Sequence, residues 1–165
     1  MSHISIREID ATDVNSCYQI ESLCFEPSEA ATVEKIRCRQ QQYPEGFLVA
    51  EIENKIVGFI NSGATNEPDL SDEDFKDLIG HDPEGKNLVI FSLAITPSHQ
   101  KTGVSRSLME AFLERSKTKN KKEVLLLCKN HLVTYYEKLG FINAGESKSD
   151  HGGFSWEEMQ LILND

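Results

Sequence analysis

The residues from Gln100 to Ser105 have the types and spacing to hold a phosphate. They form the pattern Gln100-x-x-Gly103-x-Ser105 and directly follow eight mostly apolar residues, 88–95, whose composition is typical of a buried strand. Glycine lets a ligand approach the backbone closely, and a helix start presents N–H groups without partners. The pattern therefore predicts an anion site, although the same residue types also form strand–turn–helix connections that bind nothing.

Other reactive side chains are scattered along the chain. The cysteines show neither Cys-x-x-Cys spacing nor a histidine cluster suited to zinc, so we expect reduced thiols and no metal. They are Cys17, Cys24, Cys38 and Cys128. The histidines at 81, 99 and 131 fall in expected loops or at a helix start, where most histidines are solvated and few transfer protons.

The elements after the glycine loop indicate how the anion site is positioned. Apolar residues at 104, 108, 109, 112 and 113 lie on one face of a helix. The short apolar run 124–128 then predicts a second buried strand, parallel to the first if the helix is a right-handed crossover.

The rest of the chain predicts alternating strands and helices. A strand at 4–9 precedes an amphipathic helix with Val14, Cys17, Tyr18, Glu21 and Phe25, capped by Asp10 or Thr12. Ser28 is expected to cap a second helix that runs to about residue 42, with Ile36 and Gln40 on its inner side. The other expected elements are a hairpin of 46–52 and 56–63, a short helix at 71–79 within an acidic insertion (64–87), a helix at 132–139, and strands from Phe141 and over 154–162.

Composition indicates one globular domain over residues 1–165. Hydrophobic residues make up 39% and charged residues 27% of the chain, as in ordinary soluble proteins. The sequence shows no signal-peptide profile and no apolar run long enough to span a membrane, so we expect a cytoplasmic protein with no membrane partner.

Charge is distributed unevenly. The net charge is −10, yet residues 99–122 carry +5 and the remainder −15. This asymmetry argues against nucleic-acid binding and suits a polyanionic cofactor beside the basic segment, with a cationic substrate elsewhere. Only Lys101 and Arg106 fall where they could reach a phosphate, and the lysines from 117 to 122 are expected to be solvated.

Two motifs at this separation resemble the GNAT superfamily of acetyl-CoA-dependent N-acetyltransferases. They are Phe91-Ser-Leu-Ala-Ile through Gly103, and Cys128-Lys-Asn through Tyr135-Tyr136-Glu-Lys-Leu-Gly-Phe141. The likeness covers nearly the entire chain, and within the superfamily it is clearest to the arylalkylamine (serotonin) N-acetyltransferases. It implies a GNAT fold: an α/β (α+β) domain with a mixed sheet of about six to seven strands flanked by about four to five helices.

The resemblance also implies where acetyl-CoA binds. Backbone groups of Leu93, Ala94 and Ile95 would hold the pantetheine arm, and the amides of the glycine loop would hold the pyrophosphate, as consecutive N–H groups at a helix start can. The cofactor contacts implied in all are Leu93, Ala94, Ile95, Gln100, Lys101, Thr102, Gly103, Val104, Ser105, Arg106, Asn130 and Tyr136.

The resemblance assigns two catalytic roles and leaves one open. The N–H near Leu93 would polarise the thioester carbonyl, and Tyr136 would protonate the departing thiolate. The alternative for Tyr136 is a core aromatic, a role that suits its neighbour Tyr135 better. Arylalkylamine N-acetyltransferases carry two histidines at the positions of Val89 and Phe91, so the base stays unassigned. Ser92 through a water chain, or the insertion carboxylates Glu67, Asp69 and Asp82, are alternatives.

The acceptor is the least determined part. By position alone the resemblance implies Phe25, Pro27, Phe59 and Phe154 as substrate contacts. A small-molecule primary amine, arylalkylamine-like or polyamine-like, is the expected substrate, on a monomer or homodimer. Two alternatives stay open: acetylation of a protein N-terminus or lysine, and a CoA-binding module without activity.

Overall fold

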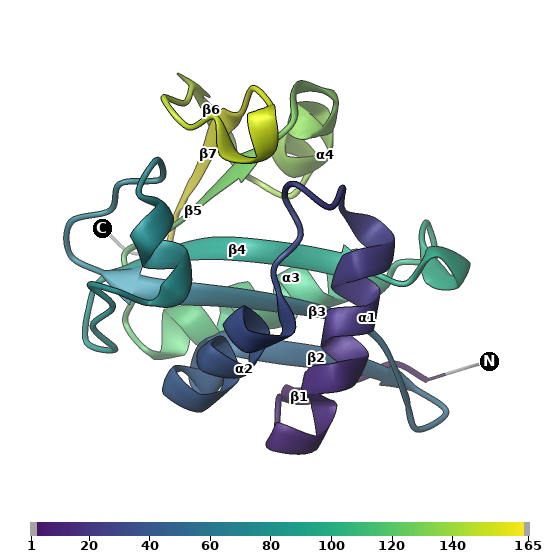
Figure 1. Ribbon diagram of the computed structural model, residues 1–165. Helices are drawn as coiled ribbons and strands as arrows, with labels where there is room; N and C mark the ends of the chain where they lie inside the picture. Colours follow the sequence, from purple (N-terminus) through teal and green to yellow (C-terminus); the bar gives the residue numbers. More distant parts are fainter. Residues whose placement is uncertain (1–2, 164–165) are drawn as a thin grey trace.

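A computed structural model describes residues 3–163 of the chain. Within that range seven strands form a single sheet in the order β1-β2-β3-β4-β5-β7-β6, with four α-helices around it (Figure 1). The strands are β1 (Ser5–Glu8), β2 (Phe47–Ile52), β3 (Lys55–Thr65), β4 (Asn87–Ile95), β5 (Glu123–Cys128), β6 (Ile142–Glu146) and β7 (Glu157–Ile162). The helices are α1 (Val14–Cys24), α2 (Val33–Gln42), α3 (Val104–Thr118) and α4 (Val133–Lys138). The expected mixed α/β domain, with six to seven strands and four to five helices, is confirmed.

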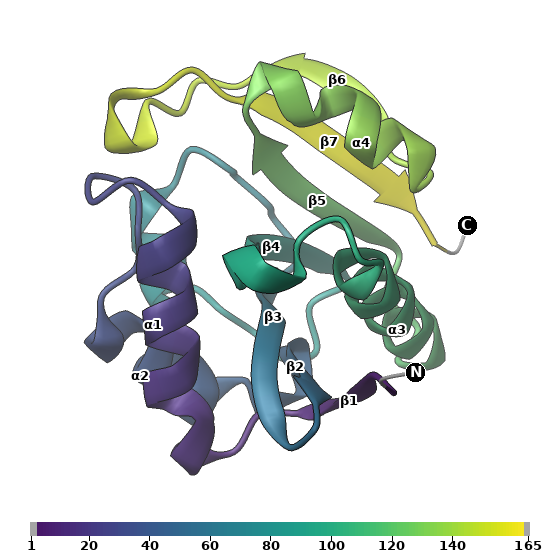
Figure 2. The same ribbon diagram turned by 90° about the vertical axis from the view of Figure 1, so that its right-hand side faces the viewer.

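The helices cover both faces of the sheet. Helices α1 and α2 pack on one face, over Phe47, Val49 and Phe59. Helices α3 and α4 lie on the other, where Leu108 and Tyr136 join a larger core (Figure 2). Because each face is covered, the central strands are apolar on both sides, and this is why their sequences read as continuous apolar runs.

The strand directions follow from the connections. Strands β4 and β5 are parallel, as the intervening helix α3 predicts, and every other neighbouring pair is antiparallel. The β2–β3 hairpin turns at Glu53 and Asn54, which both have positive φ (52° and 65°), the backbone that a two-residue hairpin with right-handed strand twist requires.

Two sequence-based expectations about local structure were wrong. The second helix begins at Val33 rather than at Ser28, because Thr32 is the residue that caps it: its hydroxyl oxygen accepts the Lys35 N–H at 3.3 Å. Lys121 is buried rather than solvated. Its ammonium donates to the carbonyls of Pro83 and Gly85, each at 2.6 Å, and so fastens the acidic insertion to the end of α3.

Candidate functional site

Strands β4 and β5 separate halfway along their length. They pair only from Asn87 to Ile90 and from Glu123 to Leu126, and beyond this point β5 turns away from β4 (Figure 2). Strand β3 pairs with the other edge of β4 as far as Ile95. The edge of β4 that faces the gap therefore offers backbone N–H and C=O groups over residues 91–95 that no strand engages.

A β-bulge lies at the point of separation. Asn61 pairs with Ser92 and Ser62 with Ile90, so Phe91 is the extra residue on β4. Alternation is broken there: Phe91 packs with Val89 on the α1–α2 side, and Ser92 lies on the same side, beside Glu21 of α1. Two successive side chains thus share one face of the sheet, beside the gap.

The glycine loop ends at the start of α3, where backbone amides without a partner in the helix are open to a ligand. Gly103 caps α3 with φ 93°, and the first hydrogen bond of the helix runs from the Ser107 N–H to the Gly103 carbonyl at 3.0 Å. The amides of residues 104–106 consequently have no partner within the helix. Helix α3 spans fifteen residues, so its dipole adds to the attraction for an anion at this end.

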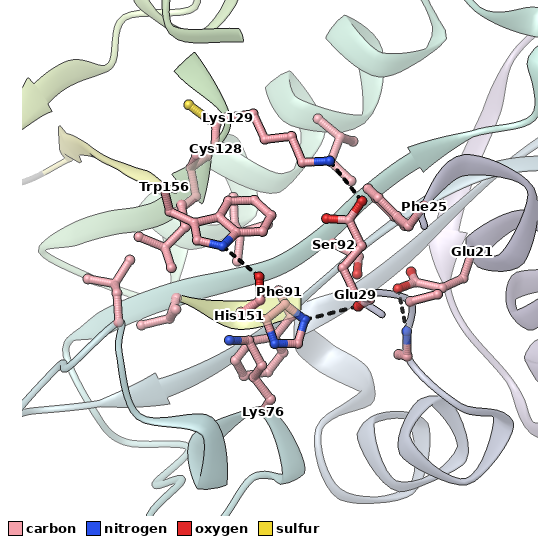
Figure 3. Close-up of a pocket in the computed structure, with 18 of the residues that line it drawn as sticks. Glu21, Phe25, Glu29, Lys76, Phe91, Ser92, Cys128, Lys129, His151 and Trp156 are labelled. Atoms are coloured by element: carbon pink, nitrogen blue, oxygen red, sulfur yellow. Dashed lines mark hydrogen bonds and ion pairs between the residues drawn. The ribbon is translucent and has the colours of Figure 1, made fainter. Parts of the chain in front are cut away.

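A cavity of about 260 Å³ lies on the α1–α2 side of the gap. We call it the central cavity. Its floor is β4 from Val89 to Leu93, one wall is α1 with the loop to α2, another is the acidic insertion, and the end of β5 with Tyr136 and Trp156 completes it (Figure 3). Glu21, Phe25 and Ser92 lie at one end in this view, with Cys128 and Trp156 toward the other.

The C-terminal loop is tied to two other segments across this cavity. His151 approaches the Glu29 carbonyl through Nε2 at 3.0 Å and the Glu73 carboxylate through Nδ1 at 2.7 Å. The Glu29 carboxylate in turn pairs with Lys129 at 3.0 Å, and the Trp156 indole N–H donates to the His151 carbonyl at 3.0 Å. The α1–α2 loop, the insertion and the C-terminal loop therefore form a common wall.

Tyr136 and Tyr135 have different surroundings. Tyr136 is 8% exposed, lines the central cavity, and stands edge-on to the rings of Tyr135 and Phe141. Burial raises the pKa of its hydroxyl, so this group is protonated throughout the neutral range. The Tyr135 hydroxyl is instead bonded to the Ser105 hydroxyl at the start of α3.

Two buried charges on the cavity wall were not among the predicted site residues. Glu21 of α1 and Arg39 of α2 are 2% and 3% exposed. Burial raises the pKa of the Glu21 carboxyl and lowers that of the Arg39 guanidinium. In the sequence, Glu21 could have been recognised as a carboxylate on the apolar stripe of the first helix. Arg39 lies three residues after the inward-facing Ile36, but Gln40 was expected to point inward instead.

The predicted coenzyme residues divide into three groups. Leu93 and Tyr136 line the central cavity. Ala94, Ile95 and Val104 have buried side chains, and the Ile95 carbonyl is already engaged by the Gln100 amide at 3.0 Å and the Cys24 thiol at 3.1 Å. The others are exposed or half-buried around the start of α3 or after β5: Gln100, Lys101, Thr102, Gly103, Ser105, Arg106 and Asn130. Of these, Arg106 pairs with Glu110 at 2.9 Å.

The predicted acceptor residues do not all reach the cavity. Phe25 lines it. Phe154 is not one of its lining residues but stands edge-on to Trp156, which is, with the Lys129 ammonium 3.9 Å from the Phe154 ring centre. Pro27 is exposed on the α1–α2 loop, and Phe59 is fully buried against Phe47 in the core beneath α1.

The predicted proton acceptors are also spread out. Asp69, Ser92 and His131 line the cavity. His81 lies elsewhere: its Nδ1 accepts the Ala64 N–H at 2.9 Å, and burial lowers the pKa of its ring. Glu67 and Asp82 are exposed on the insertion, and His99 lies before the glycine loop.

Comparison with known proteins decides the family. The sequence profile of the acetyltransferase (GNAT) family matches residues 14–141. The chain belongs to this family. Its fold agrees, since the loading GNATL domain of CurA from Lyngbya majuscula superposes with a TM-score of 0.85 at 18% identity over 98% of both chains. The structure of yncA from Salmonella typhimurium with its cofactor acetyl-CoA superposes with a TM-score of 0.70 at 16% identity, over 99% of this chain and 96% of that one.

Sequence relatives support the same assignment. The uncharacterized N-acetyltransferase YkwB of Bacillus subtilis (strain 168) is 25% identical over 158 residues, which are 89% of this chain and 69% of that protein. The chain spans less than half the length of N-acetyltransferase 8 from Rattus norvegicus. The expected class of enzyme, an N-acetyltransferase that uses acetyl-CoA, is confirmed, whereas the likeness to arylalkylamine N-acetyltransferases remains a prediction.

The site has the features that acetyl-CoA requires. Coenzyme A has a pyrophosphate, for which the unpaired amides at the start of α3 are suited. Its pantetheine arm carries amides, which can pair with the free edge of β4. Within residues 3–163 no three His, Cys, Asp or Glu side chains are grouped so as to hold a metal ion, and no helix combines the length and apolar character needed to cross a membrane.

Proposed function

We propose that this acetyltransferase acts on the primary amine of a small molecule. The observation that carries the proposal is the central cavity. At about 260 Å³, it is near the lower end of the range of small-molecule sites, roughly 300–1,000 Å³. Hydrogen bonds join the α1–α2 loop, the insertion and the C-terminal loop into one wall of this cavity. An extended peptide would need an open groove in place of this wall, so the arrangement favours a small acceptor.

The proposed arrangement places the acyl donor and the acceptor on the two sides of the β4–β5 gap. Acetyl-CoA supplies an acetyl group activated as a thioester. The amides of residues 100–105 and the backbone of Leu93 to Ile95 would hold it, with the N–H near Leu93 directed at the thioester carbonyl. The acceptor would occupy the central cavity, with Phe25 on its wall and Phe154, beside the lining residue Lys129, as the proposed aromatic contacts.

Tyr136 would supply the proton that the leaving sulfur needs. Its hydroxyl makes no hydrogen bond to another residue in the described part of the chain, and it lines the cavity beside the gap. Burial raises the pKa of the tyrosine hydroxyl, so it carries its proton at neutral pH and can donate it to the sulfur as the carbon–sulfur bond breaks. Its role is therefore that of a general acid.

The test is acetyl transfer by the purified chain. Release of CoA from acetyl-CoA is followed with arylalkylamines, polyamines and free amino acids, and in parallel with peptides that carry a free N-terminus or lysine. Turnover with free amines and none with peptides supports the proposal. Activity on peptides alone would assign a protein N-acetyltransferase instead, and acetyl-CoA binding in calorimetry without any turnover would assign a binding module.

A further inference from the structure

Two charges inside the central cavity each have an atom without a partner. The Glu21 carboxylate accepts the Ala31 N–H at 2.8 Å through Oε2, but Oε1 accepts nothing. The Arg39 guanidinium donates to the Lys76 carbonyl at 3.1 Å through Nε, but Nη1 has no acceptor. Buried polar groups in proteins are nearly always hydrogen-bonded, so an unpaired charged group needs an explanation.

The two charges do not satisfy one another. Each stabilises the charged form of the other, yet Nη1 of Arg39 and Oε1 of Glu21 are both left without a hydrogen bond. Separating opposite charges in a buried site is costly unless something completes their hydrogen bonds. Both atoms belong to residues that line the central cavity, and each lacks the hydrogen bond that a bound group could supply.

Other charges on the cavity wall are already engaged. Lys129 pairs with Glu29 at 3.0 Å, Lys76 pairs with Glu73 at 2.7 Å, and Lys35 lies 3.7 Å from Asp77. The wall also carries as many carboxylates as lysine and arginine side chains, four of each. A cavity with this balance is poorly suited to a polyamine, which would need an excess of carboxylates.

The positions of the two charges set a direction along the cavity. Glu21 lies beside Ser92, the residue before Leu93, and so next to the free edge of β4. Arg39 is held with its guanidinium 4.7 Å from the centre of the Phe91 ring and bonded to the insertion. An amine bound at Glu21 would lie near the gap, whereas a group bound at Arg39 would lie on the insertion side.

We propose that the acceptor carries a carboxylate as well as its amine, and that it is a free amino acid. Glu21 Oε1 would accept a hydrogen bond from the ammonium, and Arg39 Nη1 would donate to the carboxylate. A guanidinium is the side chain best matched to a carboxylate, and the guanidinium of Arg39 is held over the Phe91 ring, 4.7 Å from its centre. The inference rests on the proposed function and narrows its substrate class.

The experiment compares acceptors that differ only in the carboxylate. Phenylalanine is paired with phenethylamine and leucine with 3-methylbutylamine, while phenylalaninamide keeps the shape but lacks the charge. We expect kcat/KM for each amino acid to exceed that of its amine by about tenfold to a hundredfold, the usual effect of one hydrogen bond between charged groups. In Arg39→Gln, kcat/KM for the amino acids should fall to the level of the amines, whereas kcat/KM for the amines should change less than threefold.

Two controls separate recognition from folding. Arg37→Gln removes the same charge from an exposed position of the same helix and should leave the preference intact. If Arg39→Gln does not fold, inhibition of the unmodified protein tests the same inference. We expect 3-phenylpropionate to compete with the amine acceptor, and 3-phenylpropionamide to have an inhibition constant about tenfold higher.

The possible failures are distinguishable. Amines used as well as amino acids, or 3-phenylpropionate binding no better than its amide, would overturn the inference and leave the proposed function standing. An Arg39→Gln protein that loses both activities equally would assign Arg39 to structure and overturn the inference as well. No turnover with any acceptor, charged or not, would contradict the proposed function itself.

Discussion

Replacing Tyr136 by phenylalanine tests the proposed acid with little disturbance of the fold. The ring is buried and packs edge-on against Tyr135 and Phe141, contacts that phenylalanine retains. Because the hydroxyl bonds to no other residue in the described part of the chain, its removal breaks no internal hydrogen bond. We expect the free energy of unfolding to change by less than about 0.5 kcal/mol.

The effect on catalysis should be far larger. Losing a positioned general acid lowers kcat by about 10²- to 10⁴-fold, which corresponds to roughly 2.7–5.4 kcal/mol of activation free energy. Affinity for acetyl-CoA should change little. The measurements are kcat from steady-state release of CoA, Kd for acetyl-CoA from calorimetry, and unfolding by urea.

Tyr43→Phe is the matched control. Tyr43 is also buried, at 3% exposed, and burial raises its pKa to about 12. Its ring lies outside the cavity, tilted by 56° against the ring of His81 with the two ring centres 4.4 Å apart. This variant should keep kcat within twofold. A kcat for Tyr136→Phe within twofold of the unmodified chain would refute the assignment of Tyr136 as the acid.

Three further predictions concern pH, the glycine loop and the insertion. Burial raises the pKa of Asp13, but hydrogen bonds from Arg7 at 2.7 and 3.0 Å outweigh it and lower the pKa overall. Its stabilising effect is therefore complete above the unfolded-state pKa of about 3.9. Urea titrations at a series of pH values should show the free energy of unfolding decreasing below about pH 4, and this decrease should be smaller in Asp13→Asn. Gly103→Ala should lower the free energy of unfolding in urea by about 1–2 kcal/mol, because alanine is strained at φ 93°, although no atom lies within 4 Å of the added Cβ. The same variant should bind acetyl-CoA more weakly in calorimetry. An unchanged unfolding free energy and an unchanged affinity would contradict this prediction. Lys121→Met should destabilise by about 1.5–3 kcal/mol in thermal or urea unfolding, whereas Lys119→Met, at an exposed site, should change stability by less than about 0.5 kcal/mol.

Local signals were sufficient for most of the fold. The alternating hairpin strands around Asn54, the buried run at 88–95 and the apolar stripe of α3 each follow from periods of two or 3.6 residues and from turn chemistry, and these elements are found as expected. The start of α2 was misplaced because Ser28 and Thr32 are both good caps, and only the tertiary contact of Ala31 with Glu21 distinguishes them.

The site was less accessible to sequence reasoning for a physical reason. The glycine loop is continuous in sequence, so its motif could be read directly. The central cavity combines α1, α2, β4 and the C-terminal loop, and the partners of its side chains are far apart along the chain: Glu29 contacts His151, which is 122 residues away. The paired state of Lys129 and the unpaired atoms of Glu21 and Arg39 emerge only once these segments are assembled.

The bulge at Phe91 determines which side chains of β4 face the central cavity. Upstream of the bulge, Val89 faces the α1–α2 side of the sheet, where it packs under the insertion; downstream, the even-numbered Ala94 faces that side and packs against α1. Loss of the extra residue would restore regular alternation along β4, and a single side chain would then face the cavity where Phe91 and Ser92 now lie together. When relatives are aligned along this strand, the role of a side chain can be transferred from one protein to another only where the bulge is shared, because a regular strand would not place two successive side chains beside the acceptor.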